Sequence, residues 1–333
     1  MTPFNPNLAA TEDSGIFGLP FSVSEAQLVL IPVPWEATTS YGKGTSKGPR
    51  AILAASRQID LFDLELGKFY EAGIAMLEEA PEIQKMNNKA KKASVAEINA
   101  YSEKVNHFVY TQTKALLRQG KQVGLVGGDH STPFGAIQAF LEKHPQMGIL
   151  HFDAHADLRK AYDGFEHSHA SIMYNVMTKT PLSQLVQVGL RDFCEAEFNF
   201  IQENKDRITT FFDAALMEQK AQGKSWSAIC DDIVQHLPPQ VYVSFDIDGL
   251  DPRFCPHTGT PVPGGLDFQE AVYLLKKVEQ SGRQIIGFDL NEVSPGPMKP
   301  SAHKTMDSAR EWDANVGARL LYKLCGYVLK SSV

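Results

Sequence analysis

The sequence has few cysteines and no long hydrophobic run. Its four cysteines, Cys194, Cys230, Cys255 and Cys325, are far apart and form no C-x-x-C pair, which indicates reduced thiols and not a disulfide framework or zinc knuckle. The most apolar early stretch, residues 28–35, is broken by prolines and is much shorter than the roughly 20 apolar residues of a membrane helix. The N-terminus has no basic start followed by an apolar core, so a signal peptide is not expected. These absences predict a cytoplasmic protein with no membrane partner.

Positive charge is scarce as well. The chain has 32 Lys and Arg residues against 39 Asp and Glu residues, a net charge of −7, and no basic block. Because binding to nucleic acid needs a basic footprint for the phosphates, a nucleic-acid partner is disfavoured. A mildly acidic surface is compatible with a cationic small-molecule ligand but does not identify one.

The rest of the composition is that of an ordinary globular protein. Hydrophobic residues make up 43% and charged residues 21% of the 333 residues, so the chain can bury a core without a stapling disulfide or metal. No repeat, low-complexity tract or linker divides it into two compositions. We expect one domain over residues 1–333, with residues 1–25 as an irregular extension and residues 78–94 as a solvated loop that runs into a helix start.

Short apolar runs alternate with longer amphipathic segments. The runs are rich in Val, Ile and Leu without clean polar alternation, as is typical of parallel strands covered on both faces. This alternation predicts an α/β fold with a parallel sheet between helices. The expected strands are residues 28–33, 122–126, 147–153, 185–190, 240–246 and 284–290, and the expected helices are residues 92–119, 134–143, 170–178, 224–236, 267–281 and 308–330.

Acidic and imidazole side chains gather where three of the expected strands end. They are His130 in Gly-Gly-Asp-His, Asp153, His155 and Asp157 in Asp-Ala-His-Ala-Asp, and Asp246 and Asp248 in Asp-Ile-Asp. Ligands of an open parallel sheet bind outside the carboxyl ends of its strands, so three neighbouring strands would deliver these side chains to one crevice. In an extended chain, the alternate spacing of Asp153, His155 and Asp157 would also put them on the same side.

So many carboxylates cannot share a dry site without cations, because like charges at short range repel. Carboxylate and imidazole ligands without sulfur suit Mn²⁺-like ions, although imidazole also suits Ni²⁺, Co²⁺ and Zn²⁺. Six ligands are too many for one catalytic ion and fit two ions with bridging aspartates. Two ions about 3.5–4 Å apart lower the pKa of a shared water and supply hydroxide at neutral pH. The sequence therefore predicts a two-metal centre.

Other motifs carry less weight. Residues 42–48 are similar to a phosphate-binding loop, but Pro49 follows where that loop has Lys and Ser or Thr, so a flexible loop is expected.

The three metal motifs resemble those of the ureohydrolases, the family of arginases, agmatinases and their relatives. They occur in the family's order, and the resemblance runs from the Gly-x-x-x-Gly-Pro turn at Gly44–Pro49 to Glu292. It implies a three-layer α/β/α fold with a central, mostly parallel sheet, as in arginases and deacetylases. It also implies a homo-oligomer, a trimer or hexamer, and two divalent metal ions per chain, Mn²⁺ foremost with Ni²⁺ or Co²⁺ as alternatives.

The resemblance also implies roles for the matching residues. Asp157 would hydrogen-bond the bridging hydroxide, His169 in Ser-His-Ala would shuttle a proton, and Glu292 would clamp the guanidinium. Fork geometry would let Glu292 pair with two guanidinium N–H groups, and a histidine would protonate the leaving amine as urea forms. Among the ligands, His130 and Asp157 would bind one ion, His155 and Asp248 the other, and Asp153 and Asp246 both.

Two loops distinguish members of the family. The D-L-R-x-x-Y-x-G…S-H-A pattern of residues 157–170 looks like agmatinases, and Arg159, Phe165 and His167 stand where arginases carry Asn and Ser. In the second loop, Cys194 replaces the first acidic position of the arginase region that receives the substrate's α-amino group.

These loops favour a substrate without a carboxylate. Asp163, Glu166 and Glu197 would form an acidic rim for the far ammonium of agmatine, and we expect hydrolysis of agmatine to putrescine and urea. The alternatives are a guanidine hydrolase or another guanidino-compound amidinohydrolase, with arginase less favoured. A fold-related deacylase is disfavoured by the second His and second Asp of the metal motifs, and a non-catalytic binding protein by the complete ligand set.

Overall fold

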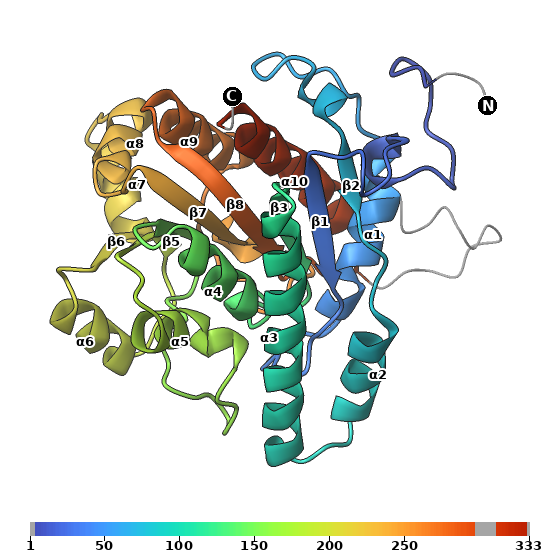
Figure 1. Ribbon diagram of the computed structural model, residues 1–333. Helices are drawn as coiled ribbons and strands as arrows, with labels where there is room; N and C mark the ends of the chain where they lie inside the picture. Colours follow the sequence, from blue (N-terminus) through green and yellow to red (C-terminus); the bar gives the residue numbers. More distant parts are fainter. Residues whose placement is uncertain (1–3, 297–310, 332–333) are drawn as a thin grey trace.

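The computed structural model describes residues 4–296 and 311–331, and a parallel sheet crosses its centre (Figure 1). The sheet has eight strands in the order β2-β1-β3-β8-β7-β4-β5-β6. In chain order, the strands are β1 (Leu28–Val33), β2 (Ile74–Met76), β3 (Gln122–Gly127), β4 (Gly148–Phe152), β5 (Gln184–Leu190), β6 (Ile208–Phe212), β7 (Gln240–Asp246) and β8 (Gln284–Asn291).

Helices cover both faces of this sheet. On one face, α1, α7, α8, α9 and α10 pack over one hydrophobic cluster, and on the other, α2, α3, α4, α5 and α6 pack over a second. Their bounds are α1 (Gly48–Ser56), α2 (Pro81–Ala90), α3 (Val95–Arg118), α4 (Phe134–Lys143), α5 (Ile172–Lys179), α6 (Glu195–Glu203), α7 (Asp213–Ala221), α8 (Trp226–Val234), α9 (Phe268–Gln280) and α10 (Trp312–Lys330). The predicted three-layer α/β/α fold is thereby confirmed.

The strands alternate their side chains between the two clusters. In β1, Leu28 and Leu30 enter the first cluster, while Val29 and Ile31 enter the second. Because both faces are covered, apolar residues at successive positions are all buried, which explains the continuous apolar runs. Local signals also place helix starts: Ser94 and Glu97 form a capping box at the start of α3.

Several expectations about the elements are wrong. The short edge strands β2 and β6 and the helices α1, α2, α6 and α7 were not anticipated. Residues 78–94 are not a solvated loop, because they contain α2, whose Ile83 and Ala90 are buried. The stretch 42–48 is not simply a flexible loop, since it ends in a 3-10 turn that leads into α1. Of the expected helix 308–330, residues 308–310 lie outside the described residues.

The N-terminal extension joins the core. Ile16 and Phe17 are buried, and the Phe17 ring lies 4.8 Å from the ring of Tyr322 in α10. In the described part of the chain, no helix combines the length and apolarity that a bilayer span needs. All four cysteines are free thiols.

Candidate metal centre and active site

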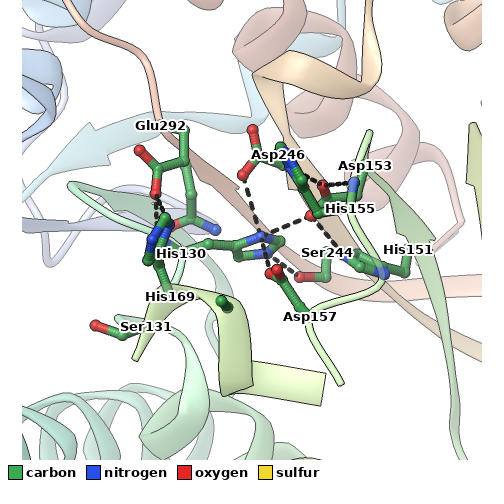
Figure 2. A network of polar contacts seen from close by, with 12 residues as sticks. His130, Ser131, His151, Asp153, His155, Asp157, His169, Ser244, Asp246 and Glu292 are labelled. Atoms are coloured by element: carbon green, nitrogen blue, oxygen red, sulfur yellow. Dashed lines mark hydrogen bonds and ion pairs between the residues drawn. The ribbon is translucent and has the colours of Figure 1, made fainter. Parts of the chain in front are cut away.

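Four adjacent strands at the middle of the sheet lead into one group of polar side chains. Strands β3, β8, β7 and β4 lie in this order, and their carboxyl ends lead to His130, Glu292, Asp246 and Asp153 (Figure 2). The prediction that three neighbouring strands carry the metal motifs is wrong, because β8 lies between β3 and β7. The insertion of β8 is what brings Glu292 to the metal motifs.

His130 is the centre of a first cluster of ligand atoms. Its Nδ1 lies 3.1 Å from Asp153 Oδ2, 3.2 Å from Asp157 Oδ2 and 3.3 Å from Asp246 Oδ2. All of these side chains are buried. Three carboxylates therefore converge on one imidazole nitrogen away from water.

His155 and Asp248 form a second cluster beside the first. His155 Nδ1 lies 3.2 Å from Asp248 Oδ2 and 3.4 Å from Asp153 Oδ1. Asp153 thus faces His155 with one carboxylate oxygen and His130 with the other. One carboxylate is therefore positioned between the two clusters.

The loop after β4 is tightly turned and not extended as expected. Asp157 has a φ of 55°, in the left-handed region that a residue other than glycine rarely adopts. The backbone N–H of His155 donates to Asp153 Oδ1 over 2.6 Å, and that of Ala154 donates to Asp248 Oδ1 over 3.0 Å. The ligands meet because of this turn, and unusual backbone geometry of this kind concentrates at functional sites.

The carboxylates perturb one another strongly. Burial raises the pKa of Asp246 well above its usual value, and the neighbouring carboxylates of Asp248 and Asp153 raise it further. Burial also acts to raise the pKa of Asp153, but the histidines around it, His151 first, outweigh that effect and hold the pKa well below its usual value. Such crowding is relieved when cations share the charge.

The donor set fits two divalent ions. Ligand atoms of His130, Asp153 and Asp157 lie within 4.8 Å of one another, and so do those of Asp153, His155 and Asp248. Imidazole nitrogen and carboxylate oxygen without sulfur suit Mn²⁺ and the neighbouring first-row ions.

Three buried polar side chains behind the ligands were not predicted from the sequence: Ser244, Asp289 and His151. His130 Nε2 lies 2.9 Å from Ser244 Oγ, which donates over 2.9 Å to Asp289 Oδ1. His151, in β4, lies 2.9 Å from Asp153 Oδ2 through its Nε2. A signal was available, because each is a polar residue inside an otherwise apolar strand.

Glu292 and His169 lie together at the edge of the first cluster. Glu292 Oε1 accepts a hydrogen bond from the backbone N–H of His130 over 2.9 Å and lies 3.3 Å from His169 Nδ1. Burial lowers the pKa of His169, but the carboxylate of Glu292 outweighs this effect and raises it above its usual value. His169 Nε2 is 3.2 Å from Ser40 Oγ.

The second oxygen of Glu292 has no hydrogen-bond partner among the described residues, although it is buried. Gly259 leaves space beside it, since an added Cβ there would lie 3.3 Å from Oε2. Buried polar atoms in proteins are nearly always paired. This oxygen is thus free to accept hydrogen bonds from a molecule that enters the site.

A cavity of about 200 Å³ opens beside the two clusters. His155, Asp157, Asp246 and His169 line it at the metal motifs. The remaining lining residues are Ser40, Arg159, Tyr162, Ala170, Asp192, Glu197 and Thr260.

The three predicted rim carboxylates have different surroundings. Glu197 lines the cavity but is buried, and its oxygens accept hydrogen bonds from the backbone N–H groups of Leu158 and Cys194. Asp163 and Glu166 are exposed on a turn outside the cavity lining. Asp192, which the sequence reasoning missed, lines the cavity with a side chain that is 68% exposed.

Arg159 gives the cavity wall a positive group as well. Its Nε lies 3.6 Å from Glu197 Oε2, and its guanidinium stacks 4.7 Å from the centre of the Tyr162 ring. Glu197 thus offsets the charge of Arg159, and Asp192 is left as the accessible carboxylate of the lining.

Known proteins are similar to this chain in sequence and in fold. A model of the Arginase family matches residues 26–324. The N(1)-aminopropylagmatine ureohydrolase of Thermus thermophilus is 34% identical over 272 residues, 81% of this chain and 84% of that protein. The agmatinase of Proteus mirabilis is 31% identical over 287 residues, 83% of this chain and 82% of that one. The solved structure of the agmatine ureohydrolase of Thermoplasma volcanium superposes with a TM-score of 0.70 at 23% identity, covering 93% of this chain and 92% of that one, and shows the same fold.

These matches cover most of the chain, including all three metal motifs. They confirm the ureohydrolase resemblance, and with it an enzyme that hydrolyses carbon–nitrogen bonds in linear amidines. The chain belongs to the arginase family.

Proposed function

We propose that this enzyme hydrolyses agmatine to putrescine and urea with two divalent metal ions, Mn²⁺ foremost. The observation that carries the proposal is the buried, unpartnered Glu292 Oε2 next to two clusters of His and Asp ligands. His130 and Asp157 would hold one ion, His155 and Asp248 the other, and Asp153 and Asp246 both. Two ions in such a site supply hydroxide at neutral pH.

Glu292 binds and orients the guanidinium in this proposal. Its Oε1 is held by the His130 N–H, and its Oε2 lies free for a substrate N–H. A guanidinium offers N–H groups in a planar fork that matches a carboxylate. Because Glu292 is buried, the pair forms away from water, and the guanidinium carbon is held in one place for attack.

His169 delivers the proton that the leaving amine needs. It lines the cavity, and its Nδ1 lies 3.3 Å from Glu292, which favours the protonated imidazole. Ser40 Oγ, 3.2 Å from Nε2, helps to fix the ring. An amine leaves readily only after protonation, and His is the usual general acid near neutral pH.

The cavity wall favours a substrate tail with an ammonium group. Asp192 is accessible there, while Arg159 is offset by Glu197. Agmatine ends in an ammonium, which is attracted to the carboxylate of Asp192, and it has no carboxylate that Asp192 would repel. Asp163 and Glu166 lie outside the cavity lining, so their predicted contact with the ammonium stays a prediction that applies only to a tail long enough to reach beyond the cavity.

A second candidate substrate is N1-aminopropylagmatine, which carries an aminopropyl group on the amine of agmatine. The name of the 34% identical Thermus relative favours it. Its longer tail has a second amine, which could reach the exposed carboxylates of Asp163 and Glu166.

The decisive experiment is a urea-release assay with the Mn²⁺-loaded enzyme. Agmatine, N1-aminopropylagmatine, guanidinobutyrate, arginine and guanidine are compared by kcat/KM at equal metal content. We expect agmatine to exceed arginine and guanidinobutyrate by at least about 10-fold, which corresponds to about 1.4 kcal/mol of preference for an ammonium tail. A win for a guanidino acid would show that Arg159 and not Asp192 reads the tail. A win for guanidine would show that no tail is read.

Asp192→Asn tests the tail contact directly. It should raise KM for agmatine and leave the KM for guanidine unchanged. The exposed Asp206, on the turn after α6, offers a matched control, and Asp206→Asn should change neither constant.

We also propose that the native metal is Mn²⁺, that the enzyme forms a trimer or hexamer, and that it works in the cytoplasm. Metal analysis of enzyme purified without added metal, light scattering in solution and cell fractionation test these three points. Ni²⁺ or Co²⁺ in the purified enzyme, or a monomer, would contradict the first two.

A further inference from the structure

His151 is completely buried behind the proposed metal ligands. It lies in β4, directly opposite Gln187 of β5, and neither side chain is exposed. Figure 2 shows His151 on the side of Asp153 that faces away from Glu292 and His169. It is also outside the cavity lining.

Hydrogen bonds determine which ring nitrogen of His151 carries the proton. Gln187 Nε2 lies 2.9 Å from the carbonyl oxygen of Ala156 and 3.0 Å from His151 Nδ1. A carbonyl can only accept, so the nitrogen of the Gln187 amide must face it, and Thr210 Oγ1 donates to Gln187 Oε1. The second N–H of Gln187 then donates to Nδ1, and the neutral His151 ring carries its proton on Nε2.

This arrangement directs the Nε2–H of His151 at Asp153. The two atoms Nε2 and Asp153 Oδ2 lie 2.9 Å apart. The other oxygen, Oδ1, accepts from the backbone N–H of His155 over 2.6 Å. Both oxygens of Asp153 are thus held in place, one toward His130 and the other toward His155.

We propose that His151 is a positioning residue for the two-metal centre, which holds the Asp153 carboxylate in the orientation that two ions can share. The inference rests on the proposed metal-dependent function. A ring nitrogen of His151 lies within 4.8 Å of the ligand atoms around His130. We assign it positioning and not ligation because its Nε2 faces the carboxylate of Asp153, whereas His130 Nδ1 faces three carboxylates. Replacement of a group that orients a metal ligand in this way typically lowers metal affinity by about 10- to 100-fold.

Two substitutions separate positioning from ligation and from simple core filling. His151→Leu has a similar volume and no donor. His151→Gln places an N–H donor near the position of Nε2 but has no imidazole nitrogen for a metal. The exposed His107 of α3 provides a control, His107→Leu, with the same chemical change at the surface.

The readout is calorimetric binding of Mn²⁺ to the metal-free protein, with the melting temperature of each metal-free variant measured alongside. We expect His151→Leu to weaken Mn²⁺ binding 10- to 100-fold, and His151→Gln to restore most of the affinity. Native affinity in His151→Leu would overturn the proposal in favour of core filling. Loss of one ion in His151→Gln, as complete as in His130→Ala, would overturn it in favour of ligation.

Gln187→Met decides the matter if His151→Leu does not fold. It leaves His151 in place but removes the donor that selects the ring tautomer, so the affinity for Mn²⁺ should fall in the same direction. Unchanged affinity in a folded Gln187→Met would overturn the proposal. These constants are measured without substrate, so a wrong substrate assignment leaves them untouched, and a wild-type chain that binds fewer than two Mn²⁺ ions would refute the metal centre itself.

Discussion

Replacement of Glu292 by Gln should lower kcat/KM, because it weakens binding of the guanidinium in the transition state, while the metal content stays unchanged. The side chain is 1% exposed, and its Oε1 accepts from the backbone N–H of His130 over 2.9 Å. In Glu292→Gln, the His130 N–H still needs an acceptor, so the amide oxygen of Gln takes the position of Oε1. The amide NH₂ group then lies where Oε2 lies in the native protein, and a donor faces the donors of the guanidinium.

The size of the effect follows from the bond that is lost. Each hydrogen bond between a carboxylate and a charged donor contributes about 1.5–3 kcal/mol. Glu292→Gln replaces Oε2, the oxygen that is free for the substrate, and loss of its one such bond costs about 1.5–3 kcal/mol, which corresponds to a decrease in kcat/KM of about 10- to 150-fold. The positive φ of 61° at position 292 is equally demanding for Glu and Gln, so the backbone contributes little to the difference.

The assay measures urea release over a range of agmatine concentrations, with metal content and melting temperature determined on the same samples. Glu203→Gln, on the exposed end of α6, is the matched control and should behave as wild type. Activity of Glu292→Gln within about threefold of wild type would refute the clamp. Loss of metal in proportion to activity would mean that Glu292 acts on the ions and not on the substrate.

Three further predictions concern the ligands and the proton donor. Asp246→Ala should empty both metal positions while His130→Ala loses mainly one, and elemental analysis that finds about two ions in Asp246→Ala would contradict the shared role of this carboxylate. His169→Ala should keep its metals and lose about 10²- to 10⁴-fold in kcat, with partial rescue by added imidazole, and a native kcat across neutral pH without imidazole would exclude the proton-donor role. Burial lowers the pKa values of His130 and His155, but the facing carboxylates have the larger effect and raise both pKa values well above the usual value. In the metal-free protein, both imidazoles are therefore protonated at neutral pH. Metal binding must displace the imidazole protons, so Mn²⁺ affinity should rise with pH. Calorimetry in buffers of different ionisation enthalpy measures the proton release, and a pH-independent Mn²⁺ affinity would refute this prediction.

Local sequence was sufficient for the central strands and the long helices. An apolar run such as that of β7, and the capping box before α3, act over a few neighbouring residues and are legible without tertiary contacts. The edge strands β2 and β6 were missed because they are short and only partly buried, so the apolar signal is weak. The metal motifs were legible for the same local reason, since each is a short segment at the end of one strand.

Tertiary structure alone decided which strand ends meet. The chain order of β3, β4 and β7 says nothing of β8, which lies between β3 and β7 and brings Asp289 and Glu292 to the site. The pairing of His151 with Gln187 depends on the register of β4 against β5. Hydrogen bonds between strands set that register, and no spacing within either strand encodes it.

The cavity wall shows the same division. Sequence placed acidic residues on two loops, but loop conformation decided which of them reach the cavity. Asp163 is exposed and has a φ of 50° in a turn, whereas Asp192 lies two residues after the end of β5 and beside His155. The sequence by itself therefore determined the central strands, the residue types of the proposed ligands and the chemistry that they support. The packing of the strands and the dihedral angles of the loops decided which side chains line the cavity, because those depend on contacts between residues far apart in the chain.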